Sequence, residues 1–378
     1  MIYLDSSATT FPKPQRVQQA AANAMKGSAN PGRSGHSLSL AAGQIIYRSR
    51  LTAAQFFDME DETRVIFTPG CTFSLNTAIN GLLSDGGHAV VSELEHNSVM
   101  RPLEALRSKG VSFSTAKVYP GDNDRTVDSF RRCINVNTKV IICTHASNVW
   151  GIRLPIERIC ALAHAYGLKI VVDAAQSAGV LPLSMQEGFD VVCAAGHKGL
   201  YGPMGTGLML LSQDMELPPL ITGGTGSNSA SLVQPTELPD RFESGTPNVS
   251  GIAGLAEGIR FVQSKGQEKL LHHEMSLIRY AWQMLSGMRG IRLYTPEPDE
   301  TSFAPVLSFN IEGMDSEETA GELSKRGIAV RAGLHCSSAA HIAAGTIDTG
   351  AVRLSPCAFT SKNDMVQTVR AVKALAGA

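Results

Sequence analysis

Short apolar runs alternate with helical segments through the first half of this chain, and this alternation limits the fold more than any other feature. Between residues 64 and 195 the apolar runs are short, and helix-compatible stretches separate them. Parallel strands need a crossover connection that is usually a helix, so this order predicts a mostly parallel sheet with helices on both faces. The expected strands are 64–68, 88–92, 111–116, 139–144, 169–173 and 190–195, and the expected helices between them are 72–83, 99–109, 127–134 and 156–166.

The chain is too long for one core, which predicts two domains. Its 378 residues exceed the about 250 to 300 residues at which single cores stop growing. We expect a large domain at 15–260 and a smaller domain at 261–378 that includes residues 1–14. Outside the alternating region, the expected elements are helices at 15–25, 38–57, 249–264, 267–288, 316–326 and 361–375, a strand at 306–311, and a strand pair around Val330 and Val352.

Charge and cysteine content limit the partners and the compartment. The net charge of −1 gives no electrostatic reason to expect nucleic acid or an anionic membrane as a partner. The N-terminal residues show no signal peptide, and no apolar run approaches the length of a membrane span. The seven cysteines are an odd number at no metal-ligand spacing, so we expect no metal site and a reducing, cytoplasmic location.

Two of the expected strands lead into residues with reactive side chains. One strand ends at Asp173, with Gln176 three positions on, and the next leads to His197 and Lys198. The carboxyl ends of parallel strands meet at one edge of a sheet, where ligands bind. An acid facing a ring nitrogen and a lysine that forms an imine are what pyridoxal 5'-phosphate (PLP) chemistry needs, so these residues predict a PLP site. The alternative is that Asp173 caps a helix and Lys198 is a solvated loop lysine.

Other polar residues belong to the same expected edge. Cys71 and Thr72 join a strand to a helix, where free N–H groups, a hydroxyl and the positive helix end can bind phosphate. His96 follows the next strand, where an imidazole can stack on a pyridine ring and shuttle protons. A lone histidine at a strand end is more often structural, which is the alternative for His96. Asn148 follows the strand at 139–144.

A loop near the C-terminus carries a candidate nucleophile. Cys336 lies among glycine and serine residues, with Arg331 and His335 nearby. Positive neighbours favour the thiolate, which is the nucleophilic form, although a buried structural thiol is the alternative. Arg353 alternates with apolar residues on a short strand and therefore needs an anion. That anion is either a substrate carboxylate or the carboxylate of a structural salt bridge.

With these residues identified, the chain resembles the cysteine desulfurases of the class V aminotransferase family. The Arg-x-Gly-x-His-Cys loop without a long insertion is similar to that of the second type, which includes selenocysteine lyases. The resemblance implies an α/β fold, the fold-type I PLP-dependent transferase, with a mostly parallel seven-stranded sheet in the large domain and a smaller α+β C-terminal domain that carries the Cys336 loop. The motifs that carry it, over nearly the whole chain, are 3–10, 95–96, 147–148, 173–176, 196–198, 241–248 and 331–336.

The resemblance implies a role for each candidate residue. Lys198 would hold PLP as a Schiff base and remove a proton from the substrate, and Cys336 would take the sulfur as a persulfide while L-cysteine becomes L-alanine. His96 would stack on the ring. The persulfide would pass to a sulfur-acceptor protein or a small thiol. The other PLP ligands would be Asp173, Gln176, Cys71, Thr72, His197 and, reaching the partner subunit's phosphate in a homodimer, Thr225; Asn148 and Arg353 would bind the substrate carboxylate, with Arg331 and His36 nearby.

Three residues depart from the family pattern. Ala195 replaces a frequent serine, and Cys71 replaces the first threonine of the usual Gly-Thr-Thr turn, so two hydroxyls of the expected phosphate site are missing. Ser337 stands where alanine is usual, with no consequence that the sequence reveals. The alternatives to a cysteine desulfurase are a selenocysteine lyase, another class V PLP enzyme such as a transaminase or lyase, and a protein that binds PLP or a sulfur-carrier partner without turnover.

Overall fold

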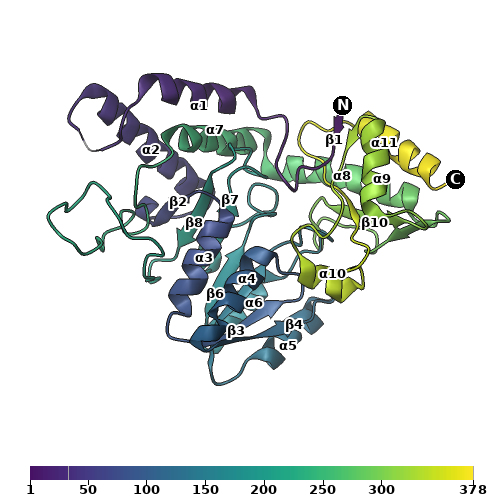
Figure 1. Ribbon diagram of the computed structural model, residues 1–378, viewed down its shortest axis with the longest axis horizontal. Coiled ribbons are helices and arrows are strands. Elements are labelled where there is room, and N and C mark those ends of the chain that lie inside the picture. The colour runs from purple at the N-terminus through teal and green to yellow at the C-terminus, as the bar shows by residue number, and fades with distance from the viewer. Residues whose placement is uncertain (33, 378) are drawn as a thin grey trace.

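A seven-stranded sheet forms the centre of the molecule (Figure 1). The computed structural model describes residues 1–32 and 34–377, so Arg33 and the last residue, Ala378, lie outside the described part. All neighbouring strands are parallel except at β8, which runs antiparallel to β7 and to β2. The predicted mostly parallel sheet is therefore confirmed. The strands in spatial order are β2 (Val65–Thr68), β8 (Gly207–Leu211), β7 (Val191–Ala195), β6 (Lys169–Asp173), β5 (Thr138–Thr144), β3 (Gly87–Ser92) and β4 (Val111–Ala116).

Helices cover both faces of this sheet because its central strands are apolar on both sides. In β6, Val171 and Val172 are each fully buried, but they belong to different hydrophobic clusters on opposite faces, as the two-residue period of a strand requires. The helices on the Val171 side are α3 (Cys71–Leu82) and α4 (Asn97–Ala105), and those on the Val172 side include α5 (Asn123–Cys133), α6 (Ile156–Ala165) and α7 (Val249–Lys265).

Helix α7 also packs against the first two helices of the chain, α1 (Gln15–Gly27) and α2 (Ser37–Phe56). Figure 1 shows these helices on the left, beside β2 and β8. A loop without helix or strand, residues 218–236, projects on the same side. Short 3₁₀ helices occur at η1 (Glu62–Arg64), η2 (Leu106–Lys109) and η3 (Met185–Glu187).

A second, three-stranded antiparallel sheet lies in the C-terminal part of the chain. Its strands are β12 (Val352–Leu354), β10 (Leu307–Ile311) and β9 (Ile291–Leu293), in that spatial order. The first strand of the chain, β1 (Ile2–Tyr3), pairs with β11 (Ile328–Ala329). Leu4, which follows β1, is fully buried in the hydrophobic cluster that also contains residues of β10 and β12. The predicted assignment of residues 1–14 and 261–378 to one small domain remains a prediction. The helices here are α8 (Gln267–Leu285), α9 (Ser316–Lys325), α10 (Ser338–Ala344) and α11 (Lys362–Leu375).

The predicted strand pair around Val330 and Val352 is wrong. β11 pairs with the N-terminal β1, and β12 pairs with β10. The two segments meet in a short antiparallel bridge between Arg331 and Arg353, beside which Ala351 N donates to the Gly333 carbonyl at 3.2 Å. Helix α5 begins at Asn123, earlier than predicted, because Asp122 caps it by accepting a hydrogen bond from Arg125 N at 3.0 Å. β8, β9 and α10 were not predicted.

Within residues 1–32 and 34–377, no helix is both long enough and apolar enough to cross a membrane. Cys143, Cys160 and Cys193 are buried, and Cys133 is half-buried. The same part of the chain contains no group of three or more His, Cys, Asp or Glu side chains that could hold a metal ion.

Candidate active site

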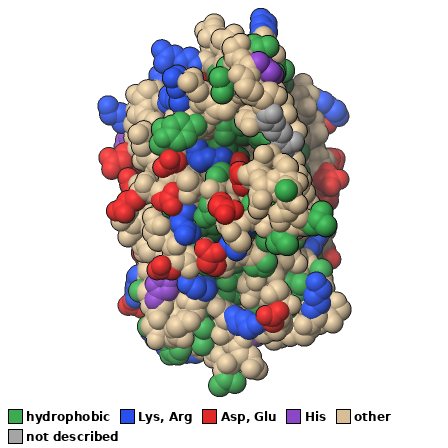
Figure 2. Space-filling model, turned by 90° about the vertical axis from the view of Figure 1, so that its left-hand side faces the viewer, with side chains coloured by type: hydrophobic (Ala, Val, Ile, Leu, Met, Phe, Trp, Pro, Cys, Tyr) green, Lys and Arg blue, Asp and Glu red, His purple; other side chains and the backbone are tan. Residues whose placement is uncertain are grey.

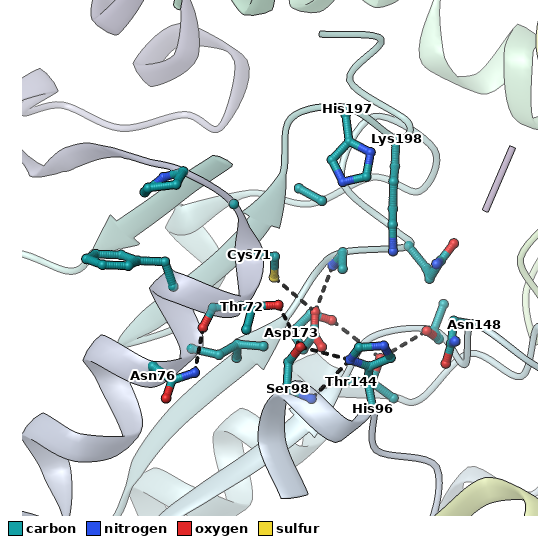
Figure 3. A pocket seen from close by; sticks show the side chains of 18 of the residues that line it. Cys71, Thr72, Asn76, His96, Ser98, Thr144, Asn148, Asp173, His197 and Lys198 are labelled. Carbon is teal, nitrogen blue, oxygen red and sulfur yellow. Dashed lines mark hydrogen bonds between the residues drawn. The ribbon is translucent and has the colours of Figure 1, made fainter. Parts of the chain in front are cut away.

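A cavity of about 680 Å³ opens at the carboxyl ends of β3, β5, β6 and β7. Figure 3 shows the side chains from these strand ends and from the start of α3 pointing into it. The sheet brings together predicted residues as distant in the chain as Cys71 and Lys198, which are 127 positions apart. Eight of the predicted site residues line the cavity: Cys71, Thr72, His96, Asn148, Asp173, Gln176, His197 and Lys198.

Asp173 is the last residue of β6 and is only 3% exposed. Its Oδ1 accepts a hydrogen bond from Ala175 N at 2.9 Å and a contact from the Cys71 thiol at 3.4 Å. Among the described residues, none donates a hydrogen bond to Oδ2. Asp173 lines the cavity, so this free carboxylate oxygen can accept a hydrogen bond from a ligand, and a protonated ring nitrogen is a suitable donor.

Lys198 follows β7 on a loop that is held from two sides. The carbonyl of the preceding His197 accepts hydrogen bonds from Thr10 N at 3.1 Å and Lys13 Nζ at 2.7 Å. On the other side, a Cβ at Gly199 would come within 2.5 Å of the Ala178 carbonyl oxygen, so the chain passes closely there and glycine is required. The backbone at Lys198 is therefore fixed.

Burial leaves more of the Lys198 amine unprotonated, and so available as a base or nucleophile, than in an exposed lysine. Burial is the main cause that lowers the pKa of Lys198. The positive charges of Arg353 and Arg331 lower this pKa further, and the negative charge of Asp173 opposes the shift. A lower pKa leaves a larger fraction of the amine unprotonated near neutral pH. This is the property that imine formation and proton removal require, so Lys198 is not the solvated loop lysine of the alternative interpretation.

His96 caps α4 and faces the cavity as a neutral ring. Its Nδ1 accepts a hydrogen bond from Ser98 N at 3.0 Å, which assigns the ring proton to Nε2. Burial, followed in effect by the nearby Lys198 and Arg331, lowers the pKa of His96 to about 4, while Asp173 opposes this. The histidine that caps the helix can therefore also present an uncharged face to an aromatic ligand.

The start of α3 fits a phosphate group. Gly70 is the N-cap residue and provides no side-chain cap, and no described residue accepts a hydrogen bond from Cys71 N or Thr72 N. A Cβ at Gly207 would lie 2.6 Å from the Gly70 backbone, so these two backbone segments approach as closely as glycine allows. Nearby, Nδ1 of His197 is buried without a partner among the described residues, and burial lowers the pKa of His197 to about 4. Unpaired N–H groups at a helix N-terminus bind anions.

Asn148 connects the cavity to the C-terminal loop. Its Nδ2 donates to the carbonyl of His335 at 2.9 Å, and its Oδ1 accepts from Ser337 Oγ at 2.6 Å. Both loop residues are buried, at 3% and 0% exposure. Residues 335 and 337 flank the candidate nucleophile, so Asn148 holds the loop on either side of Cys336.

Cys336 is exposed at the edge of this region and does not line the cavity itself. Its backbone and that of His335 have positive φ values of 56° and 52°, a conformation that costs energy for residues other than glycine. The Cys336 carbonyl accepts from Asn97 N at 2.8 Å, next to His96 of the cavity wall. Arg331 Nη2 lies 3.9 Å from the sulfur. The thiol is thus held in a defined loop beside a positive charge, and the alternative of a buried structural thiol does not apply.

Arg353 is 1% exposed and already has an anionic partner. Its Nη2 is 2.8 Å from Asp5 Oδ1, and its Nη1 donates to the Asn148 carbonyl at 2.8 Å. The structural salt bridge that the sequence left open is therefore present. Nε of Arg353 is buried without a partner among the described residues.

Five predicted residues lie outside the cavity lining: Cys336, Arg331 and Arg353, which are described above, and His36 and Thr225. His36 is exposed and caps α2 by accepting from Ser39 N at 3.3 Å. Thr225 is in the exposed loop 218–236, where its hydroxyl lies 2.9 Å from Ser227 Oγ. The predicted roles of His36 and Thr225 remain predictions. The role of Thr225 also requires a partner subunit.

The sequence reasoning did not identify three residues that support the site. Ser98 holds both the His96 ring and the Thr72 hydroxyl, the latter at 2.8 Å. Its position just inside the helix that His96 caps is a signal that was available. Lys13 and the contact of Ser337 with Asn148 were not predictable, since each depends on segments far apart in the chain.

Comparisons with known proteins agree with this fold. A sequence model of the family described as Aminotransferase class-V matches residues 2–368. A protein named cysteine desulfurase from Salmonella agona (strain SL483) is 31% identical over 348 residues, which are 89% of this chain and 84% of that protein.

Two solved structures of cysteine desulfurases superpose on nearly the whole chain. The apo structure from Thermococcus onnurineus NA1 has a TM-score of 0.92 at 31% identity and covers 100% of this chain and 94% of its own. That of CsdA (S-sulfonic acid) from Escherichia coli has a TM-score of 0.88 at 26% identity, covering 98% of this chain and 94% of its own.

Proposed function

The chain belongs to the class V aminotransferase family, and from this premise we propose that it is a PLP-dependent cysteine desulfurase that converts L-cysteine into L-alanine and takes the sulfur onto Cys336 as a persulfide. One observation carries the proposal. Lys198 and Asp173 face one cavity, and Asn148, on the wall of that cavity, is bonded to the loop on both sides of an exposed thiol. Relatives with this fold are named cysteine desulfurases.

The residues present fit the cofactor that the family uses. Asp173 would bind the ring nitrogen through its free Oδ2, and His96 would stack on the ring as a neutral imidazole. When bound, PLP supplies an electron sink for the negative charge that develops on the substrate Cα. The remaining contacts would be Lys198 at the aldehyde carbon, Gln176 at the ring hydroxyl, and Cys71 N, Thr72 and His197 at the phosphate.

Lys198 and His96 handle protons in this proposal. The unprotonated Nζ of Lys198 takes the proton from the substrate Cα, because its pKa is lowered by burial. His96 carries its proton on Nε2, as the hydrogen bond from Ser98 N requires. Its Nε2–H can therefore donate a hydrogen bond to a leaving or product atom while the ring stays neutral.

Cys336 receives the sulfur. Its thiolate, beside the Arg331 guanidinium, attacks the substrate sulfur, and an S–S bond forms as the substrate Cβ–S bond breaks. The electron pair of the broken bond stays with the substrate carbon, which takes up protons and leaves as alanine. The two positive-φ residues and their hydrogen bonds to Asn97 and Asn148 keep the thiol ready for this step.

The substrate carboxylate would lie near Asn148 and Arg353. Nε of Arg353 is a buried donor without a partner, and Asn148 Nδ2 has a second N–H beyond the one that it gives to His335. Arg331 adds positive charge nearby. Cysteine brings one carboxylate, which matches this set of donors.

The proposal includes a homodimer. Hydrophobic side chains are exposed on α2 and in the loop 218–236, and Figure 2 shows hydrophobic patches among charged groups on this face of the molecule. Exposed apolar patches of this kind are typical of subunit interfaces. The loop with Thr225 would then approach the partner subunit's phosphate site. The exposed apolar residues are Leu38, Leu40, Tyr47, Leu220, Ile221, Leu232 and Val233.

We assign the enzyme to the second type of desulfurase because the segment from Arg331 to Ser337 is short and bonded to the cavity wall. The persulfide would pass to a sulfur-acceptor protein or a small thiol, which reaches Cys336 because this thiol is exposed.

The test is an assay of alanine and sulfide formed from L-cysteine by the PLP-loaded protein, with a dithiol as acceptor. Wild type should form both in equal amounts. Cys336→Ser should keep the visible absorbance of the bound cofactor and lose sulfide release. Cys133→Ser, at a half-buried cysteine remote from the cavity, is the matched control and should behave as wild type.

Four outcomes distinguish the alternatives. Full activity of Cys336→Ser on cysteine overturns the assignment of the nucleophile. Activity of that variant on selenocysteine alone indicates a selenocysteine lyase, because selenide leaves more readily than sulfide. Formation of a keto acid without sulfide indicates a transaminase, and no turnover at all indicates a binding protein.

A further inference from the structure

The thiol of Cys71 contacts the acid of the proposed cofactor site. Cys71 is the first residue of α3 and is 8% exposed. Its sulfur lies 3.4 Å from Asp173 Oδ1 and 3.3 Å from the carbonyl oxygen of Cys193. Figure 3 shows the sulfur directed toward the Asp173 carboxylate from the wall of the cavity.

The one proton of this thiol prefers the carboxylate over the carbonyl. Both acceptors are at similar distances, but a hydrogen bond to an ionised acceptor is roughly twice as strong as one between neutral groups. Burial is the main cause that raises the pKa of the Cys71 thiol, and the negative charge of Asp173 raises it further. The thiol therefore keeps its proton and acts as a donor.

We propose that Cys71 is a positioning residue for Asp173. Together with Ala175 N, the Cys71 thiol holds Oδ1 of the Asp173 carboxylate, so that Oδ2 of the same carboxylate faces the cavity. A carboxylate with one donor can rotate about its Cβ–Cγ bond, whereas two donors at the same oxygen restrict that rotation. Ala175 N is 2.9 Å from Oδ1 and lies on the same loop as Asp173, while Cys71 belongs to a different element. The inference rests on the proposed PLP site and is independent of sulfur transfer.

This role accounts for a residue that departs from the family pattern. Cys71 stands where a threonine is usual in relatives, so a phosphate hydroxyl is lost. The sulfur instead extends away from the helix start to the end of β6, where it meets the acid. The backbone N–H of Cys71 remains available for an anion, so one residue serves both ends of the cofactor site.

The test is a double-mutant cycle on the affinity of the apoprotein for PLP. The dissociation constant is measured by titrating PLP and following the visible band that depends on Lys198. Cys71→Ala should raise the Kd about fivefold, the effect of losing one net hydrogen bond. In the Asp173→Asn background, the same substitution should change the Kd by less than about twofold, because the amide does not need the same orientation.

Two further variants distinguish loss of the hydrogen-bond donor at Cys71 from loss of buried side-chain volume. Cys71→Ser keeps an O–H donor at this position and should lose less affinity than Cys71→Ala. Cys193→Ala removes a fully buried thiol of the neighbouring strand that does not bond the Asp173 side chain, so its effect should be the same in both backgrounds. Circular dichroism checks that each variant is folded, and if Cys71→Ala does not fold, Cys71→Val, which also lacks the donor, carries the cycle.

The outcomes distinguish this inference from the proposed function. The positioning role is overturned if Cys71→Ala loses the same PLP affinity in the wild-type and the Asp173→Asn background. It is also overturned if Cys71→Ser loses as much PLP affinity as Cys71→Ala. Either result leaves the proposed function intact. Failure of wild type to take up PLP with a band that depends on Lys198 overturns both.

Discussion

The hydrogen bond from Ser337 to Asn148 gives the sharpest quantitative prediction for the substrate site. The bond is 2.6 Å long between side chains that are 0% and 8% exposed. Ser337→Ala would leave Asn148 Oδ1 buried without a donor, which costs about 1 to 3 kcal/mol. Asn148 keeps two other bonds, from its Nδ2 to His335 and from Arg353 to its carbonyl, so we expect the lower end of that range.

The assay is steady-state turnover of L-cysteine by the PLP-loaded protein. A loss of about 1 kcal/mol in positioning the amide that binds the carboxylate corresponds to about a fivefold rise in KM. The carboxylate does not take part in bond breaking, so kcat should change less than about twofold. Urea denaturation should show a decrease of about 1 to 2 kcal/mol in the free energy of unfolding.

Ser361→Ala is the matched control. Ser361 caps α11 through a capping box with Asp364, and its loss should lower stability by about 1 kcal/mol without touching the cavity. KM should then rise in Ser337→Ala and stay unchanged in Ser361→Ala. An unchanged KM in Ser337→Ala despite lower stability would refute the reasoning and leave Ser337 with a structural role only.

Three other predictions test the site and its support. Lys198→Ala should show no visible band with PLP and no product, and a retained band would contradict the assignment of the amine. Gly199→Ala should lose PLP affinity and stability by about 1 to 3 kcal/mol, since its Cβ would come within 2.5 Å of the Ala178 carbonyl oxygen. Wild-type affinity and stability in Gly199→Ala would show that the loop is not closely packed. Burial raises the pKa of Glu95 from 4.5 to about 8. Because the folded-state pKa is the higher one, the stability of wild type relative to Glu95→Gln should be greatest below about pH 4.5 and fall until about pH 8. Urea denaturation at pH 5, 7 and 9 measures this difference, and a difference that does not depend on pH would exclude the burial effect.

The sequence predicts most of the central sheet because its strands and helices differ in period and length. The strand at β8 was missed because Gly207–Leu211 is a five-residue, fully buried apolar run, which periodicity alone does not identify as a strand. The pairing of β11 with β1 was missed because it joins residues more than 300 positions apart, and no local signal specifies such a partner.

The same limit applies to the site. The convergence of Asp173, His96 and Lys198 was predictable, since the carboxyl ends of parallel strands share one edge. The contact of Ser337 with Asn148 spans 189 positions and depends on how the C-terminal part docks, so the sequence does not reveal it. Arg353 could be recognised as needing an anion, but the choice of Asp5 as that anion required the structure.

The most direct test of the account is a single turnover of the PLP-loaded protein with L-cysteine and no acceptor, followed by alkylation and peptide mass spectrometry. The account predicts one additional sulfur atom on the peptide that contains Cys336, in an amount equal to the alanine formed. Alanine formed without sulfur on Cys336, or sulfur found on another cysteine, would contradict it.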